Sequence, residues 1–333
     1  MVQEVIITES RKINNYLYHI DLKEFGTRKI LSSYIAEFDD CTIFLDCGTS
    51  LEINKLLNFA KEHNISLNNA KYLIPTHHHF DHAGGMWKLY EIVKKYNSKI
   101  KILTNEATRV LLNKYESHLN RAKRTFGQFI GEMKPIEDQA FNIIEPMHFS
   151  DGNIKNIEII DEFKKNGSEI QLAVLKTPGH THDHQCPVFI KDGKIDFIYF
   201  GESVGTIYHS SKLITLPTSM PVYFNFMDYM KSLSNLIKIK PKSNYAGFGH
   251  FGVIKGNENI NKILLEHKEF MELFRQEMIN AYNEDPQTKH VVEKLTPILT
   301  PRTDLIKGGH PILSNIILGI VYGMMIDLGY RKD

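Results

Sequence analysis

The chain has 333 residues, and its 40 lysines and arginines nearly balance its 39 aspartates and glutamates, which leaves a formal net charge of +1. This balance gives no overall attraction to nucleic acid or to an anionic membrane, so we expect neither as a partner. The length allows one large domain or two smaller ones. Three cysteines, Cys41, Cys47 and Cys186, are too few for a disulfide framework and predict a reducing, cytoplasmic location.

The N-terminal part of the chain combines predicted strands with predicted helices. Runs rich in β-branched and aromatic residues predict strands at residues 15–20, 30–37, 41–46, 71–75 and 99–104. Apolar residues at near-helical spacing predict helices at residues 51–63 and 86–96. Taken alone, this pattern indicates a mixed α/β class.

Residues 105–147 interrupt the pattern. Their first part, 105–120, has helical spacing, and basic residues surround the aromatic residues Phe126 and Phe129 that follow. We expect a helical insertion here, either as a solvated surface element or as a lid over an active site.

The rest of the chain changes from strands to helices. Strand-like runs resume at residues 154–160, 170–176, 187–190 and 195–200, and the turn pairs between them are Asp151-Gly152, Asn166-Gly167 and Asp192-Gly193. Helical patterning dominates from residue 258 to the end. We therefore predict a main domain at residues 1–257 and a helical extension at residues 258–333 that packs on it.

The C-terminal segment 312–326 is mostly apolar, and Gly319 and Gly323 form a pair of small residues at a spacing of four. A membrane span needs about 20 apolar residues, so this segment is short for a bilayer. We predict a buried C-terminal helix whose small residues allow close packing, with a homodimer interface as one use of that surface.

Residues 76–82 bring four histidines and an aspartate together directly after the predicted strand 71–75. Side chains at such a strand-to-loop edge can converge without burial of the backbone. Neutral imidazoles and a carboxylate are ligands that suit zinc and, less exclusively, iron or manganese. A solvated histidine run without function is the alternative, and the density of the cluster argues against it. The segment therefore predicts a metal site.

The cluster resembles the central His-x-His-x-Asp-His signature of the metallo-β-lactamase superfamily. Only one register fits, with His77, His79, Asp81 and His82 at the signature positions. The likeness extends over roughly residues 15–255. It implies a four-layer αββα sandwich in which His77 and His79 bind one metal while Asp81 and His82 bind a second.

The same resemblance implies two further histidine ligands. His180 lies on the turn Thr177-Pro178-Gly179-His180-Thr181 and corresponds to the third ligand of the first metal. His250 lies in the glycine-rich segment 247–252, where glycines let the backbone approach the metals closely. It would complete the ligand set of the second metal.

Glu202 departs from the family pattern. Relatives carry an aspartate after a strand and a glycine, where its carboxylate bridges the two metals, whereas here the predicted strand and Gly201 lead to a glutamate. Glutamate has the same charge and ligating atoms but is one methylene longer, so bridging stays feasible with a shifted backbone or a different carboxylate mode. The alternative is that Glu202 points elsewhere and the second metal binds weakly.

Four further side chains are candidates for contact with a substrate. His182 and His184 follow the His180 turn, and we expect them to support the ligands or to face the substrate rather than to bind metal. Tyr208 and His209 follow Glu202 at a short distance in the sequence and are candidates for the same role.

These residues together imply a hydrolase with two divalent metal ions per chain, most readily zinc, with iron or manganese as alternatives. Two such ions lower the pKa of a shared water, and the resulting hydroxide would attack an ester, thioester, lactone or phosphoester of a small molecule. Asp81 would orient the nucleophile and later carry a proton to the leaving group. Residues 1–257 then form the catalytic domain, which is most similar to glyoxalase II-like and lactonase-like members of the superfamily.

Two other classes of function stay open. Some members of the superfamily bind two irons and handle oxygen or electrons, and they use a carboxylate at the second histidine position of the signature. His79 keeps the histidine there, which favours hydrolysis. The third class is a sensor that keeps its metals but only binds a ligand.

Overall fold

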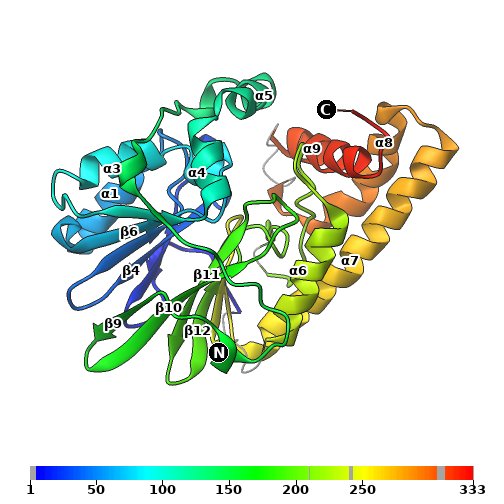
Figure 1. Cartoon of the computed structure of the whole chain (residues 1–333). Coiled ribbons are helices and arrows are strands. Elements are labelled where there is room, and N and C mark those ends of the chain that lie inside the picture. Colours follow the sequence, from blue (N-terminus) through cyan, green and yellow to red (C-terminus); the bar gives the residue numbers. More distant parts are fainter. Residues whose placement is uncertain (1–4, 210, 240–242, 306–311, 333) are drawn as a thin grey trace.

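The computed structural model describes residues 5–209, 211–239, 243–305 and 312–332. Two seven-stranded sheets face each other within these ranges (Figure 1). The first sheet has the order β2 (Arg11–Lys12), β3 (Leu17–Asp21), β4 (Ser32–Glu37), β5 (Thr42–Leu45), β6 (Ala70–Ile74), β7 (Lys101–Thr104) and β8 (Phe141–Ile143). The second has the order β1 (Ile6–Ile7), β14 (Val253–Lys255), β13 (Tyr245–Gly247), β12 (Lys194–Tyr199), β11 (Gln185–Lys191), β10 (Ser168–Lys176) and β9 (Asp161–Lys165).

Aromatic side chains from both sheets fill the space between them. The ring of Tyr34 on β4 lies 5.3 Å from that of Phe197 and 4.8 Å from that of Tyr199, both on β12. All three side chains are fully buried. Each large aromatic ring removed from water contributes on the order of 2–3 kcal/mol, so this layer holds the two sheets together.

Helices cover the outer face of each sheet, which gives four layers. On the first sheet, α1 (Ile53–Glu62) buries Ile53, Leu56 and Ala60, whose spacing of three and four places them on one helical face. The helix α3 (Met86–Val93) packs on β6 beside it. On the second sheet, α7 (Asn257–Glu284) packs on β13 and β14, and α6 (Phe226–Lys238) lies along α7 (Figure 1). The predicted αββα sandwich is therefore confirmed.

The segment predicted as a helical insertion, 105–147, is helical only in part. It contains α4 (Glu106–Asn113), α5 (Glu116–Phe126) and the short 3-10 turns η3 (Gly127–Ile130) and η4 (Asp138–Ala140). Its end forms β8, which pairs in parallel with β7 and completes the first sheet. A strand of three residues is too short to show a period of two in the sequence, so the pattern of residues 105–147 does not predict β8.

The strand predicted at residues 154–160 is also wrong. The chain forms a 3-10 turn there, η5 (Ile154–Asn156), and the neighbouring strand begins only at Asp161. The side chain of Asn153 accepts a hydrogen bond from the backbone N–H of Lys155, and such a local bond competes with strand pairing. The turn pairs Asn166-Gly167 and Asp192-Gly193 do connect adjacent antiparallel strands, and all four residues have positive φ.

The C-terminal segment forms α8 (Thr288–Leu299), η6 (Thr300–Arg302) and α9 (Ile312–Asp327) beyond α7. Among the described residues, no helix has the length and apolar content needed to cross a membrane. The two small residues of α9 face a loop of the same chain. A Cβ on Gly323 would lie 2.0 Å from the carbonyl oxygen of Ser219, and one on Gly319 would lie 2.9 Å from the end of the Met220 side chain. Close packing within the chain therefore accounts for both glycines.

Candidate metal centre

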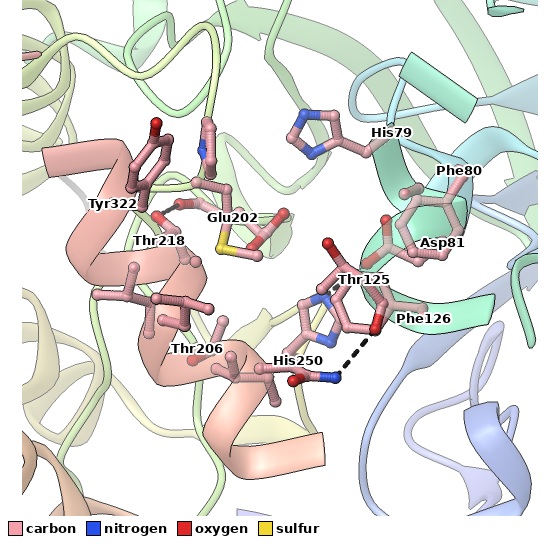
Figure 2. A pocket seen from close by; sticks show the side chains of 18 of the residues that line it. His79, Phe80, Asp81, Thr125, Phe126, Glu202, Thr206, Thr218, His250 and Tyr322 are labelled. Carbon is pink, nitrogen blue, oxygen red and sulfur yellow. Dashed lines mark hydrogen bonds and ion pairs between the residues drawn. The ribbon is translucent and has the colours of Figure 1, made fainter. Parts of the chain in front are cut away.

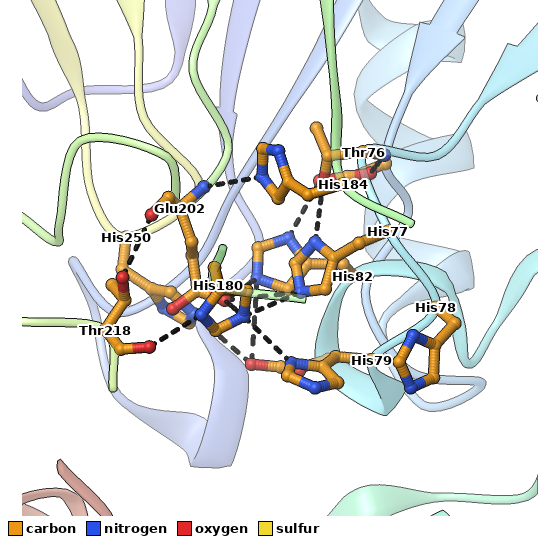
Figure 3. Close-up of polar contacts among 12 residues, drawn as sticks. Thr76, His77, His78, His79, His82, His180, His184, Glu202, Thr218 and His250 are labelled. Atoms are coloured by element: carbon orange, nitrogen blue, oxygen red, sulfur yellow. Dashed lines mark hydrogen bonds and ion pairs between the residues drawn. The ribbon is translucent and has the colours of Figure 1, made fainter. Parts of the chain in front are cut away.

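The predicted ligands gather at one edge of the sandwich because of how the strands run. The strands β5 and β6 are parallel neighbours, so the residues after them, including the histidine cluster, emerge at the same edge of the first sheet. The strands β12 and β13 are also parallel neighbours, which brings Glu202 and His250 to one edge of the second sheet. His180 follows β10 in a loop that meets the same place (Figure 3).

The ligand atoms form two groups. In the first, Nε2 of His180 lies 3.2 Å from Nε2 of His77 and 3.1 Å from Nδ1 of His79. In the second, Nε2 of His250 lies 3.2 Å from Nε2 of His82 and 3.2 Å from Oδ2 of Asp81. The atoms of each group lie within 4.8 Å of one another, as donors around a common ion must.

Glu202 contacts both groups through a single oxygen. Its Oε2 lies 2.8 Å from Nε2 of His180 and 3.3 Å from Nε2 of His77, which belong to the first group. The same oxygen lies 3.3 Å from Nε2 of His82 in the second group. Figure 3 shows these side chains turned toward one another. The longer glutamate thus reaches the place between the groups where the superfamily's aspartate is expected.

Hydrogen bonds behind the histidines decide which ring nitrogen carries a proton. Nδ1 of His180 lies 2.7 Å from the carbonyl oxygen of Thr218, and Nδ1 of His250 lies 2.7 Å from that of Ile30. A carbonyl oxygen can only accept, so each Nδ1 donates and each neutral ring presents a lone pair at Nε2. Nδ1 of His82 donates to the carboxylate of Asp46 at 2.8 Å, so its Nε2 also points inward.

This arrangement fits a bound cation. Nε2 of His82 and Nε2 of His250 face each other at 3.2 Å, so their lone pairs would repel unless a proton or a cation lies between them. All the histidines concerned are buried, so water compensates little for that repulsion. The donor set of imidazole nitrogens and carboxylate oxygens is the one that divalent transition metals prefer.

Asp46 is a supporting residue that sequence reasoning missed. Its Oδ2 accepts a hydrogen bond from the Thr76 hydroxyl at 2.9 Å and from the Tyr199 hydroxyl at 2.6 Å, in addition to the bond from His82. Because the Thr76 hydroxyl donates to Asp46, it accepts from Nδ1 of His77 at 3.0 Å. One carboxylate therefore orients a ligand of each group. Its position at the end of β5, beside the end of β6, is the signal that could have identified it.

The charges in the centre suit metal binding. Burial and the neighbouring imidazoles lower the pKa of His77 and His79 well below its usual value, so both rings are neutral. Burial alone would raise the pKa of Glu202, but His180, His77 and His82 hold it well below its usual value. Burial alone would lower the pKa of His82, but the carboxylates of Asp81 and Asp46 raise this pKa well above its usual value. A metal ion at Nε2 of His82 would therefore take the place of a proton.

The helices α6, α7 and α9 support the segment that carries Glu202. The hydroxyl of Tyr229 on α6 contacts the carbonyl oxygen of Glu202 at 3.1 Å and Nε2 of His267 on α7 at 2.7 Å. The Thr218 hydroxyl donates to the same Glu202 carbonyl at 3.0 Å. The loop that carries Thr218 continues into Ser219, against which α9 packs, so all three helices α6, α7 and α9 help to position the centre.

The structure separates the four predicted substrate contacts. Tyr208 lines the cavity above the centre, and its ring lies 5.7 Å from that of His250. His184 instead accepts a hydrogen bond from the backbone N–H of Glu202 at 3.1 Å, so it supports a ligand. His182 is exposed, and His209 lies beside a second cavity, 3.5 Å from Asp304. His182, His184 and His209 do not line the main cavity, and His184 has the supporting role that the sequence allowed for it. For His182 and His209, contact with a substrate stays a prediction.

A third group of histidines lies next to the centre and does not fit a metal. It consists of His78, His79 and His118, which is on α5. Nε2 of His118 accepts a hydrogen bond from the backbone N–H of Phe80 at 3.1 Å. The neutral ring therefore carries its proton on Nδ1 and has no lone pair left for an ion. His78 is fixed by Asp183, whose Oδ1 lies 2.9 Å from its Nδ1.

A cavity of about 440 Å³ opens above the centre. Its floor contains the ligands His79, Asp81, Glu202 and His250, and its walls come from α5, α9 and the loop between β3 and β4. Figure 2 shows Tyr322 and Thr218 on one side of the cavity and Phe80, Asp81 and Phe126 on the other. The helix α5, one of the elements of the predicted insertion, is thus a wall of the cavity.

Residues 26–197, more than half of the chain, match the sequence profile of the Metallo-beta-lactamase superfamily. The chain belongs to the metallo-β-lactamase superfamily. Among characterised sequences it is similar to the metallo-beta-lactamase fold-containing protein ST1585 of Sulfurisphaera tokodaii. The two are 26% identical over 239 residues, which cover 72% of this chain and 77% of the relative.

Solved structures agree with this assignment. The crystal structure of ST1585 from Sulfolobus tokodaii matches with a TM-score of 0.55 and 25% identity, over 76% of this chain and 85% of that one. A metallo-beta-lactamase from Cronobacter sakazakii with a mutated HARLDQ motif matches with a TM-score of 0.53 and 15% identity, over 84% of this chain and 99% of that one. The second likeness shows the fold alone. Membership of the superfamily and the clustered ligands together indicate binding of a divalent metal.

Proposed function

We propose that the protein is a hydrolase that holds two divalent metal ions, most readily zinc, and cleaves an ester, thioester, lactone or phosphoester of a small molecule. The position of Glu202 carries this proposal. Its Oε2 lies within 3.3 Å of His77, His82 and His180, which come from two different ligand groups. A carboxylate between two cations offsets their mutual repulsion, so this contact favours a pair of ions over a single one.

The residues around the pair divide the work of hydrolysis. If two divalent ions were held by these residues, they would make a hydroxide available near neutral pH and would polarise the oxygen of the bond under attack. Asp81 reaches the cavity with its carboxylate, and its Oδ2 lies 3.2 Å from Nε2 of His250. Burial would raise the pKa of Asp81, but His82 and His250 keep it below its usual value, so the group is ionised. It can therefore accept a proton and pass it to the leaving group.

The cavity supports a small molecule as the substrate. Its volume of about 440 Å³ lies in the range of small-molecule sites and is too small for a folded macromolecule. The free and buried state of Cys41, Cys47 and Cys186 supports a reducing, cytoplasmic setting as part of the same proposal.

Metal analysis and activity assays together test the proposal. The protein would be purified without added metal and again after loading with zinc, and its metal content measured by inductively coupled plasma mass spectrometry. We expect two ions per loaded chain and hydrolysis of at least one of four substrate types, namely aryl esters, thioesters, lactones and phosphodiesters. Treatment with a chelator should abolish that hydrolysis and zinc should restore it.

The same measurements separate the other classes of function. Two irons in the purified protein, with oxygen consumption and no hydrolysis, would contradict the proposal in favour of a redox protein. Two metals with no turnover of any substrate type would contradict it in favour of a ligand sensor.

A further inference from the structure

One buried carboxyl group beside the cavity takes no part in the metal centre. Glu24 lies in the loop between β3 and β4, in the 3-10 turn η1 (Glu24–Gly26), and it lines the cavity. Its side chain is fully buried. Neither of its carboxyl oxygens has a hydrogen-bond partner among the described residues.

An unpartnered carboxyl group in such a place is costly to the folded protein. A buried polar group without a hydrogen bond destabilises by about 1–3 kcal/mol. The neighbouring buried glutamate is different, because Glu52 accepts a hydrogen bond from the Thr49 hydroxyl and pairs with Lys55 at 3.5 Å. Glu52 does not line the cavity, so Glu24 is the one of the two that combines unpartnered oxygens with a place in the cavity lining.

The backbone holds Glu24 in place in spite of an unfavourable conformation. Lys23 and Phe25, on either side of it, have φ values of 50° and 53°, a region that side chains other than glycine rarely adopt. The carboxylate of Asp21 fixes the loop by accepting hydrogen bonds from the backbone N–H groups of Lys23 at 2.9 Å and Lys29 at 3.2 Å. Strain of this kind persists where the conformation serves a purpose.

The surroundings of Glu24 define what it can bind. Phe25 beside it stacks on Phe126 of α5, with ring centroids 5.5 Å apart, and Ile316 and Ile320 of α9 add to the apolar walls. Burial and the negative charges of Asp81 and Glu52 raise the pKa of Glu24 well above its usual value. An anionic group would meet the same carboxylates and be repelled. A hydroxyl group is uncharged and both donates and accepts, so it can pair with the carboxyl in either protonation state.

We propose that Glu24 binds a hydroxyl group on the acyl part of the substrate, which makes the substrate a hydroxylated short-chain ester or lactone. This assignment rests on the proposed hydrolase function. The carbonyl of the substrate would face the metal ligands, its hydroxyl would meet Glu24, and its carbon chain would lie against the apolar walls formed by α5 and α9.

Binding of the acid products tests the assignment without any turnover. Hexanoate and the five isomeric hydroxyhexanoates, which carry one hydroxyl at carbon 2, 3, 4, 5 or 6, would be titrated into the zinc-loaded protein by calorimetry. We expect at least one isomer to bind about tenfold or more tightly than hexanoate. In the Glu24→Leu variant this preference should vanish while hexanoate binds as before, and Glu24→Gln should keep a weaker preference. Glu52→Gln is the matched control and should keep the full preference.

Each other outcome has a definite meaning. Equal binding of all six acids by the unaltered protein would overturn the assignment. A preference for a hydroxylated acid that survives in Glu24→Leu would also overturn it. Simple chelation of zinc by the acid with its hydroxyl at carbon 2 would produce that second result. The ethyl esters of the same acids test the proposed function separately. A binding preference that depends on Glu24, without hydrolysis of any ester, would contradict the hydrolase and leave the hydroxyl site standing. Hydrolysis of an ester without a binding preference that depends on Glu24 would contradict the hydroxyl site and leave the hydrolase standing.

Discussion

The metal centre and the cavity above it are built in different ways. Four of the seven predicted ligands come from residues 77–82. The rings of His82, His180 and His250 are held by hydrogen bonds to the buried residues Asp46, Thr218 and Ile30, respectively. The cavity walls come from the loop between β3 and β4, from α5 and from α9, which lie far apart in the sequence. Most of the predicted ligands thus come from one short segment, whereas the residues that line the cavity are spread along the chain.

The largest effect should follow from removal of a ligand. The His79→Ala variant takes one nitrogen from the first group, so we expect loss of bound metal and hydrolysis close to background. His182→Ala is the control, because His182 is exposed and lies outside the cavity lining. Metal content and initial rates of the two variants, measured side by side, decide the point. Full activity in His79→Ala would show that the register of the ligands is wrong.

A smaller effect should follow from loss of the carboxylate behind the ligands. Asp46→Asn weakens the support of His77 and His82 together, and such changes typically lower metal affinity by about 10–100-fold. Asp196→Asn is a matched control, since Asp196 accepts a bond from the Tyr16 hydroxyl at 2.8 Å but contacts no ligand. Competition with a chromophoric chelator measures both affinities. Equal affinities would mean that Asp46 supports the fold and not the centre.

The contact between α9 and the centre can be tested with two glycines of the same helix. Gly323→Ala places a methyl group 2.0 Å from the Ser219 carbonyl oxygen, so the backbone must move, and we expect a loss of about 1–3 kcal/mol in the free energy of unfolding. In Gly319→Ala the methyl group meets the flexible end of Met220, and the loss should be smaller. Urea unfolding measures both. Ser219 follows Thr218, whose carbonyl oxygen accepts the hydrogen bond from His180. Gly323→Ala should therefore also weaken metal binding. Unchanged metal affinity would show that α9 does not help to position the centre.

Loss of Glu24 should have the smallest effect and the opposite sign. Glu24→Leu removes an unpartnered buried carboxyl group, so the free protein should gain about 1–2 kcal/mol of stability. Glu52→Leu should lose stability instead, since Glu52 has partners. Thermal unfolding of both zinc-loaded variants gives the comparison. A destabilised Glu24→Leu would mean that Glu24 already has a partner in the free protein.

The sequence predicted the centre far better than the walls, for physical reasons. Ligands of both predicted metals follow one strand at short spacings, so His77, His79 and Asp81 can be recognised together. Glu24 stands alone in its loop, and its importance depends on missing partners, which only the fold reveals. His118 likewise belongs to a helix, α5, whose amphipathic pattern predicts that one face is buried but not which element covers that face. The strand β8 was not predicted because a strand of 3 residues is too short to show a period of two in the sequence.

The account depends most directly on Glu202 as the link between two ions. Zinc titration of the unaltered protein and of Glu202→Ala, Glu202→Gln and Glu202→Asp measures this link. We expect two zinc ions per chain in the unaltered protein and in Glu202→Asp, which restores the usual residue of the superfamily. Glu202→Gln keeps the shape without the charge and should bind the pair weakly, and Glu202→Ala should lose the second ion first, because the repulsion between two cations is then poorly offset. Two ions bound by Glu202→Ala with unchanged affinity would contradict the account.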